Sequence, residues 1–138
     1  MEYVAGFLFS EDRERVVLIK KNKPAWQKGC LNGVGGKIEP GETNKQAMRR
    51  EFLEETGLDI STWREVIDLS SPAGWVVHFF TAYGDVDQAK TMTEEEVVVA
   101  SVKSLPENVL YNLHWLVPIG LDETLQFPIK MSEGSGAC

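Results

Sequence analysis

The stretch from Gly35 to Leu58 constrains this chain most, because it joins a glycine-rich loop to a helix with two marked ends. Pro40-Gly41 is a pair typical of turns and separates the loop from the helix. Thr43 is a favourable N-cap residue, and Gln46, three residues later, completes a capping box. Gly57 suits the left-handed position at which a chain leaves a helix. The sequence therefore predicts a helix between Thr43 and Gly57.

Three glutamates share one face of this helix. Glu51, Glu54 and Glu55 stand at i, i+3 and i+4, so at about 100° per residue they fall within one arc. Like charges at this spacing cost roughly a few tenths of a kcal/mol, so the cluster does not stabilise an isolated helix. A solvated acidic face is the usual interpretation. A divalent cation is the alternative, because Mg²⁺ binds through a few carboxylates and keeps positions for water and substrate phosphate.

The spacing of the whole stretch decides between these interpretations. The fixed positions are Gly36, Glu42 after five residues, Arg50-Glu51 after seven more, then Phe52, Leu53, Glu54-Glu55, Thr56, Gly57 and Leu58. This series resembles the Nudix box at every fixed position, which is a far more specific signal than a glycine-rich loop alone. The resemblance implies an α/β fold of the Nudix type, an α/β/α sandwich with a central mixed β-sheet. Periodicity alone predicts only a mixed α and β domain.

The resemblance also implies an activity, the hydrolysis of a nucleoside diphosphate linked to another moiety. Glu51, Glu54 and Glu55 would hold Mg²⁺, or Mn²⁺ as an alternative, with the backbone carbonyl of Gly35 as a further ligand. Divalent metals neutralise a diphosphate and lower the pKa of bound water. The general base would be Glu51 or one glutamate of the run Glu94, Glu95 and Glu96, and both assignments stay open.

Arg50 is expected to orient the glutamate cluster by pairing with Glu42 across the junction between loop and helix. A contact of this kind fixes metal ligands without touching substrate. The ordinary alternative is a surface ion pair worth at most about 1 kcal/mol.

The expected substrate depends on a second resemblance. The segment Leu31 to Lys37 is similar to the Trp-Asn-Gly-Phe-Gly-Gly-Lys stretch of the oxidised-purine triphosphatases, in which Asn32 matches a base-contacting asparagine. A turn residue accounts for Asn32 equally well. We expect Asn32 and Lys37 to bind substrate, together with Asn112 and with Trp115 on a late helix like that of the MutT-type enzymes. The mammalian enzyme has paired aspartates where this chain has Tyr111-Asn112, and this departure weakens the base assignment.

A nucleoside triphosphate, with an oxidised purine as first choice, is therefore the expected substrate, cleaved to monophosphate and pyrophosphate. ADP-ribose and dinucleoside polyphosphates are the alternatives within the enzyme class. A nucleotide-sensing module that does not cleave its ligand is the alternative from another class. The complete set of Glu51, Glu54 and Glu55 argues against such a sensor, because a pure binder needs no full metal cluster.

Length and charge narrow the remaining possibilities. The 138 residues fit one domain, 1–138, and the net charge of −7 argues against a nucleic-acid partner, which clustered Lys and Arg would bind. Cys30 and Cys138 are too few and too badly placed for a disulfide framework. No stretch approaches the roughly 18 apolar residues of a membrane span. We expect a soluble, cytoplasmic protein with a small-molecule nucleotide as partner and no membrane, either a monomer or a homodimer.

Apolar patterning outside the box predicts the other elements. The strands are expected at 3–9, 15–20, 63–69, 75–83 and 97–102, a helix at 111–122, and a flexible tail at about 131–138. The first two strands suggest a hairpin, and their unbroken apolar runs also fit strands covered on both faces. Pro118 should bend or divide the last helix. His78 is expected to be a packed or hydrogen-bonded strand residue. Of Trp26, Trp75 and Trp115, at most one is expected to touch nucleotide.

Overall fold

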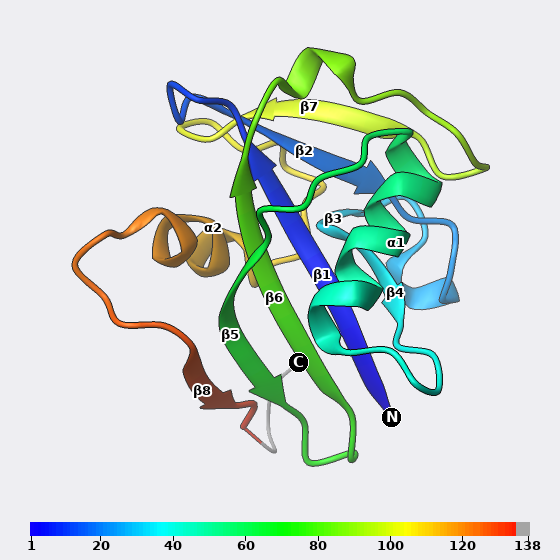
Figure 1. Ribbon diagram of the computed structural model, residues 1–138, viewed down its shortest axis with the longest axis vertical. Helices are drawn as coiled ribbons and strands as arrows, with labels where there is room; N and C mark the ends of the chain where they lie inside the picture. Colours follow the sequence, from blue (N-terminus) through cyan, green and yellow to red (C-terminus); the bar gives the residue numbers. More distant parts are fainter. Residues whose placement is uncertain (135–138) are drawn as a thin grey trace.

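The computed structural model describes residues 1–134 and consists of one mixed sheet between two helices (Figure 1). The strands are β1 (Glu2–Phe9), β2 (Arg15–Lys20), β3 (Leu31–Asn32), β4 (Val34–Lys37), β5 (Arg64–Ser70), β6 (Val76–Tyr83), β7 (Val97–Ser101) and β8 (Ile129–Ser132). The helices are α1 (Asn44–Thr56), α2 (Leu113–Leu121) and the short 3₁₀ turns η1 (Ala25–Gln27) and η2 (Val86–Gln88). The predicted α/β/α sandwich with a mixed central sheet is confirmed.

The eight strands form one sheet with two strands off its main path. Its main path runs β3-β2-β1-β6-β5-β8, while β4 pairs with β1 and β7 pairs with β2. The pairs β1–β6 and β5–β8 are parallel and the others are antiparallel. Within 1–134, no helix combines the length and apolar character that crossing a bilayer requires.

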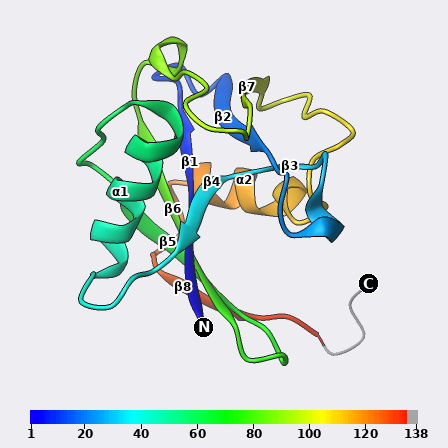
Figure 2. The same ribbon diagram turned by 90° about the vertical axis from the view of Figure 1, so that its right-hand side faces the viewer.

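Strand β1 is buried on both faces, which is why its sequence reads as one apolar run. Val4 and Leu8 pack with α1, whereas Phe7 and Phe9 belong to the core on the α2 side. Figure 2 shows the two helices on opposite sides of the sheet. Both interpretations of the first two strands are therefore correct, since β1 and β2 form an antiparallel hairpin and are also covered on both sides.

Helix α1 begins and ends where its caps predict. The Thr43 hydroxyl accepts the N–H of Gln46, the Gln46 side chain accepts the N–H of Thr43, and Gly57 has φ 78°. The helix approaches the sheet closely at Gly6, where an added Cβ would lie 2.7 Å from the Met48 methyl carbon. The absence of a side chain at Gly6 thus lets Met48 of α1 pack directly on β1.

One prediction at the C-terminal end is answered in part and another needs correction. Pro118, expected to bend or divide its helix, lies inside α2, which continues to Leu121, so the helix is not divided. Met131 and Ser132, expected in a flexible tail, belong to β8, which pairs in parallel with β5 through Leu69–Met131 and Ser70–Ser132. The expected tail at 135–138 lies outside the described residues. The alternation of half-buried and exposed residues in β8 is typical of an edge strand.

Candidate active site

The guanidinium of Arg50 lies at the centre of the acidic cluster. Its Nε and Nη2 donate to the two carboxylate oxygens of Glu42 at 2.6 and 2.8 Å, which is the bidentate geometry of a strong charge-assisted contact. Its Nη1 donates to Glu51 at 2.9 Å, and Nη2 also donates to the Lys37 carbonyl at 3.2 Å. Arg50 therefore joins the loop to the glutamate face, and the expected Arg50–Glu42 pair is present.

Glu51 is held against the glycine pair of β4. A Cβ added to Gly36 would lie 2.6 Å from the carboxyl carbon of Glu51, so a side chain there would displace this carboxylate. A Cβ added to Gly35 would lie 1.9 Å from the carbonyl oxygen of Val4 in the paired strand β1. The sheet therefore requires glycine at Gly35, whereas glycine at Gly36 leaves the flexible end of Glu51 in place.

The predicted metal ligands lie in an environment that favours a cation. Burial raises the pKa of Glu51, against the opposing effect of Arg50, and burial also raises the pKa of Glu55. Glu54 is the most exposed of the three and lies 3.4 Å from Arg50 Nη1. Three partly shielded carboxylates on one helix face, next to a backbone with no side chain at Gly35 and Gly36, suit a hard divalent cation with oxygen ligands. The residue types therefore suit Mg²⁺ or Mn²⁺, but their carboxylates are not yet gathered: within 1–134, only Glu65, Asp68 and His78 form a group of three such side chains with ligand atoms within 4.8 Å of one another.

The glutamates after η2 are placed differently from one another. The Glu95 carboxylate accepts the backbone N–H of Asn22 at 2.6 Å and lies 3.2 Å from the Lys21 ammonium group. The side chains of Glu94 and Glu96 make no hydrogen bond among residues 1–134 and are exposed. Both oxygens of Glu95 are thus engaged, so of this run only Glu94 and Glu96 have free carboxylates.

A cavity of about 530 Å³ opens beside the glycine pair, on the face of the sheet opposite α1. Apolar residues from β1, β5 and β6, including Ala5, Leu69 and Phe79, form its inner wall. Gly35 and Gly36 line it as well, and Glu51 packs against Gly36. The cavity and the acidic face therefore meet at two glycines without side chains.

Polar groups converge on this cavity from three segments. Asn32, Lys37 and Asn112, all predicted to bind substrate, line it. The Asn32 Oδ1 accepts the N–H of Gly33 at 2.7 Å, which leaves its amide N–H groups for another partner. The side-chain oxygens of Asn112 and of Gln27 are buried and make no hydrogen bond within the described part of the chain. Buried amides of this kind need a partner, which a bound base can supply.

The structure brings three of the four predicted substrate residues together and places the fourth elsewhere. Trp115 is half-buried, packs against the core on the α2 side and does not line the cavity. Trp26 and Trp75 both line it, and Trp26 is 72% exposed. The sequence did not identify Gln27, for which no motif gives a signal.

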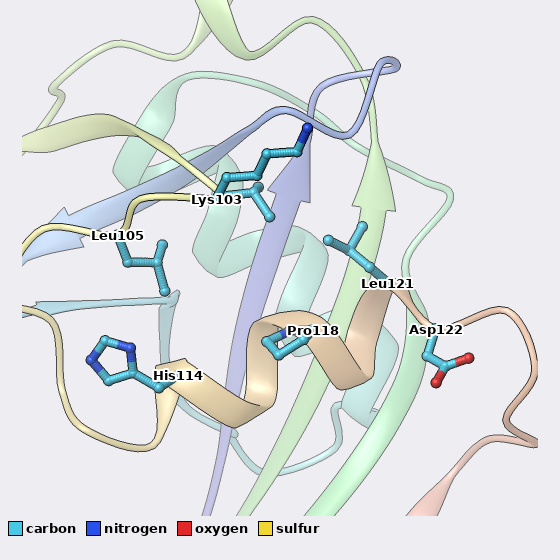
Figure 3. A pocket seen from close by; sticks show the side chains of 7 residues that line it. Lys103, Leu105, His114, Pro118, Leu121 and Asp122 are labelled. Carbon is cyan, nitrogen blue, oxygen red and sulfur yellow. The ribbon is translucent and has the colours of Figure 1, made fainter.

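Two other features lie away from this site. A cavity of about 510 Å³ on the outer side of α2 is bounded by His114, Leu105, Pro118 and Asp122, and no predicted site residue lines it (Figure 3). On the sheet, ligand atoms of Glu65, Asp68 and His78 lie within 4.8 Å of one another. Both nitrogens of His78 are occupied, by Asp68 at 2.7 Å and Glu2 at 2.8 Å. His78 is thus a hydrogen-bonded strand residue, as expected.

The chain is a mixed α/β sandwich with a carboxylate-rich helix face beside a cavity of about 530 Å³, an arrangement suited to a divalent cation and a phosphate compound. Comparison with known proteins is more specific: the NUDIX domain family matches residues 2–121. The chain belongs to the NUDIX domain family.

The relatives agree with this assignment. The oxidized purine nucleoside triphosphate hydrolase of Mus musculus is 39% identical over 71 residues, which cover 48% of this chain and 46% of that protein. The Danio rerio protein of the same name is 46% identical over 50 residues, which cover 36% of this chain and 32% of that protein. The matches thus span less than half of either relative.

Solved structures share the fold. A NUDIX hydrolase from Nitrosomonas europaea has a TM-score of 0.75 at 22% identity, covering 96% of this chain and 78% of that one. A MutT NUDIX hydrolase from Burkholderia pseudomallei has a TM-score of 0.70 at 20% identity, covering 85% and 95%.

Proposed function

We propose that this protein is a Mg²⁺-dependent pyrophosphohydrolase that cleaves a nucleoside triphosphate, with an oxidised purine base as the preferred form, to monophosphate and pyrophosphate. The observation that carries the proposal is the junction at Gly35 and Gly36, where the carboxylate face of α1 meets a cavity lined by amides. A base bound by the amides would have its phosphates directed toward the glutamates.

Glu51, Glu54, Glu55 and the Gly35 carbonyl would hold the metal, which when bound neutralises the diphosphate and lowers the pKa of coordinated water. Lys37 lines the cavity and brings a positive charge to the phosphate end. Arg50 holds Glu51 in place through its contact with Glu42. Glu51 is the proposed proton acceptor, because its carboxylate is held by Arg50 and packs against Gly36, where the acidic face meets the cavity.

The base end of the site supports a purine. Asn32 presents its amide N–H groups with its oxygen already engaged, and Asn112 contributes a buried oxygen with no partner in the described part of the chain. The similarity to the mouse and zebrafish oxidized purine nucleoside triphosphate hydrolases favours oxidised purines among the nucleotides.

The test is pyrophosphate or phosphate release, with Mg²⁺, from a panel of normal and oxidised nucleoside triphosphates, ADP-ribose, nucleotide sugars and dinucleoside polyphosphates. Glu54→Gln serves as the metal-ligand variant, and Glu11→Gln, an exposed glutamate in the turn between β1 and β2, serves as the control. Preference for an oxidised purine triphosphate, lost in Glu54→Gln and kept in Glu11→Gln, is the expected result. Binding without turnover across the panel would favour a nucleotide sensor.

A further inference from the structure

The segment from Thr93 to Glu95 lies between the acidic face of α1 and the loop that walls the cavity. The hydroxyl of Thr93 donates to Glu55 Oε2 at 2.8 Å. The same hydroxyl oxygen accepts the backbone N–H of Glu95 at 3.1 Å. Because the oxygen accepts from a fixed backbone group, its hydrogen is left to point at the carboxylate. The orientation of Glu55 is therefore tied to the backbone of this segment.

The other end of the segment holds the cavity loop. The Glu95 carboxylate accepts the Asn22 backbone N–H at 2.6 Å and pairs with Lys21 at 3.2 Å, and Asn22 Nδ2 donates to the Glu94 carbonyl at 3.0 Å. The side chains of Lys21 and Glu95 are only 19% and 16% exposed, so this pair differs from the solvated ion pairs that contribute little. Lys21 and Lys23 both line the cavity.

A local turn accounts for part of this arrangement. A threonine hydroxyl that accepts the N–H two residues later is a common turn motif and needs no functional explanation. The turn does not explain the hydrogen bond from the Thr93 hydroxyl to Glu55, which joins residues 38 positions apart and ends on a carboxylate of the proposed metal site. It also does not explain why the carboxylate of Glu95 is turned toward the loop at Asn22.

We propose that Thr93 is a positioning residue for the metal ligand Glu55, and that Glu95 is a clamp for the cavity loop rather than the proton acceptor. One segment thereby fixes both the metal end and the nucleotide end of the site. The proposal rests on the proposed function, because it requires Glu55 to bind metal.

The first experiment measures Mn²⁺ binding to the protein by calorimetry without nucleotide. Residues that orient metal ligands typically change metal affinity about 10–100-fold, so Thr93→Val should weaken Mn²⁺ binding by about that factor. Thr93→Ser keeps the hydroxyl and should bind within about twofold of wild type. Thr124→Val removes a similar exposed threonine–carboxylate bond, from Thr124 to Asp122 at 2.6 Å, in the loop after α2 and should change nothing. Thr93 is exposed, so its replacement leaves the core intact.

The outcomes separate the two proposals. Wild-type affinity in Thr93→Val, or equal weakening in Thr93→Ser, overturns the positioning role and leaves the proposed function standing. Failure of the wild-type protein to bind Mn²⁺ overturns both.

The second experiment addresses Glu95 through its kinetics. Glu95→Gln should raise KM several-fold with kcat nearly unchanged, because the loop loosens while the chemistry stays intact. Lys21→Gln should do the same, and the double variant should be no worse than either single one, as expected for two residues that act through one contact. A general base contributes about 10²–10⁴-fold to the rate, so a kcat loss of that size in Glu95→Gln would identify it as the proton acceptor and overturn the clamp.

Discussion

At the scale of single residues, the bidentate contact of the Arg50 guanidinium with Glu42 distinguishes this site from an ordinary acidic surface. Its neighbour Arg49 makes an equally good fork, with Asp59 at 2.6 and 2.8 Å, but both of those side chains are about half exposed and far less shielded than Arg50 and Glu42. A lysine cannot reproduce two parallel bonds to one carboxylate. Replacing each of the two arginines with lysine therefore distinguishes a role in orienting the glutamates from a role of positive charge alone.

We expect Arg50→Lys to lower kcat by about 10–100-fold, because the Glu42 and Glu51 carboxylates lose their common donor. Arg49→Lys should leave kcat unchanged. Steady-state kinetics with Mg²⁺ measures both. Near-full activity in Arg50→Lys would show that the contact between Arg50 and Glu42 is an ordinary ion pair.

The two glycines of β4 should respond to alanine in different ways. In Gly36→Ala the new methyl group meets the end of a flexible side chain, Glu51, so the fold should persist while Mn²⁺ affinity and activity fall at least about tenfold. In Gly35→Ala it meets the Val4 carbonyl, a backbone atom in the paired strand, so stability itself should fall. Thermal unfolding beside Mn²⁺ titration distinguishes them, and equal destabilisation by both would show that Gly36 is structural only.

At the scale of elements, the helix that carries the glutamates is held at its start by the Thr43 capping box. Thr43→Ala should cost about 1 kcal/mol of unfolding free energy, because the N–H of Gln46 loses its acceptor. Thr43→Ser keeps the oxygen and should cost much less. Urea unfolding measures the difference, and equal losses in both variants would mean that the methyl group of Thr43 matters rather than its hydroxyl.

The elements that the sequence predicted well are those with local signals. Caps defined α1, and apolar runs located β1, β2, β5, β6 and β7 within about one residue. The strands β3, β4 and β8 carry no such signal, because they are short and their pairing is set by distant partners. β8 in particular is a strand only because Leu69 and Ser70 offer it a parallel edge. Sequence patterns near Met131 therefore indicate a tail.

At the scale of the whole molecule, the acidic face and the cavity differ in how well the sequence predicted them. The spacing of the glutamates and Arg50 along one helix made the acidic face predictable. The cavity is assembled from β1, β3, β4, β5, β6, η1 and the residues just before α2, so residues such as Gln27 could be found only once these segments were folded together. Trp115 lies outside the cavity because the chain contributes Leu110 and Asn112 to its wall and no residue of α2 itself. Thr93 has no motif and is identified only by its contact with Glu55.

His78 provides a whole-molecule prediction because it joins three strands that are distant in sequence. From β6 its ring contacts Asp68 on β5 and Glu2 on β1, and Glu65 lies 3.6 Å away. Burial lowers the pKa of His78, but the hydrogen bonds to Glu2 and Asp68 and the negative charges of Asp68 and Glu65 together raise it by more, so the net pKa is above the ordinary value of 6.5. The folded protein therefore binds this proton more tightly than the unfolded chain does.

The sign of the pH effect follows from that difference. A raised pKa in the folded state gives stability that is fully present below about pH 6.5 and is lost as the pH rises through the folded-state pKa. We expect the unfolding free energy of the wild-type protein to fall over this interval relative to His78→Gln, which lacks the titrating group. His114→Gln, which removes the exposed second histidine, should follow the wild-type curve. Urea unfolding between pH 6 and 9 measures all three proteins. A wild-type advantage over His78→Gln that stays constant or grows with pH would show that the ring is neutral between Asp68 and Glu2, and that the three strands are held there by hydrogen bonds alone.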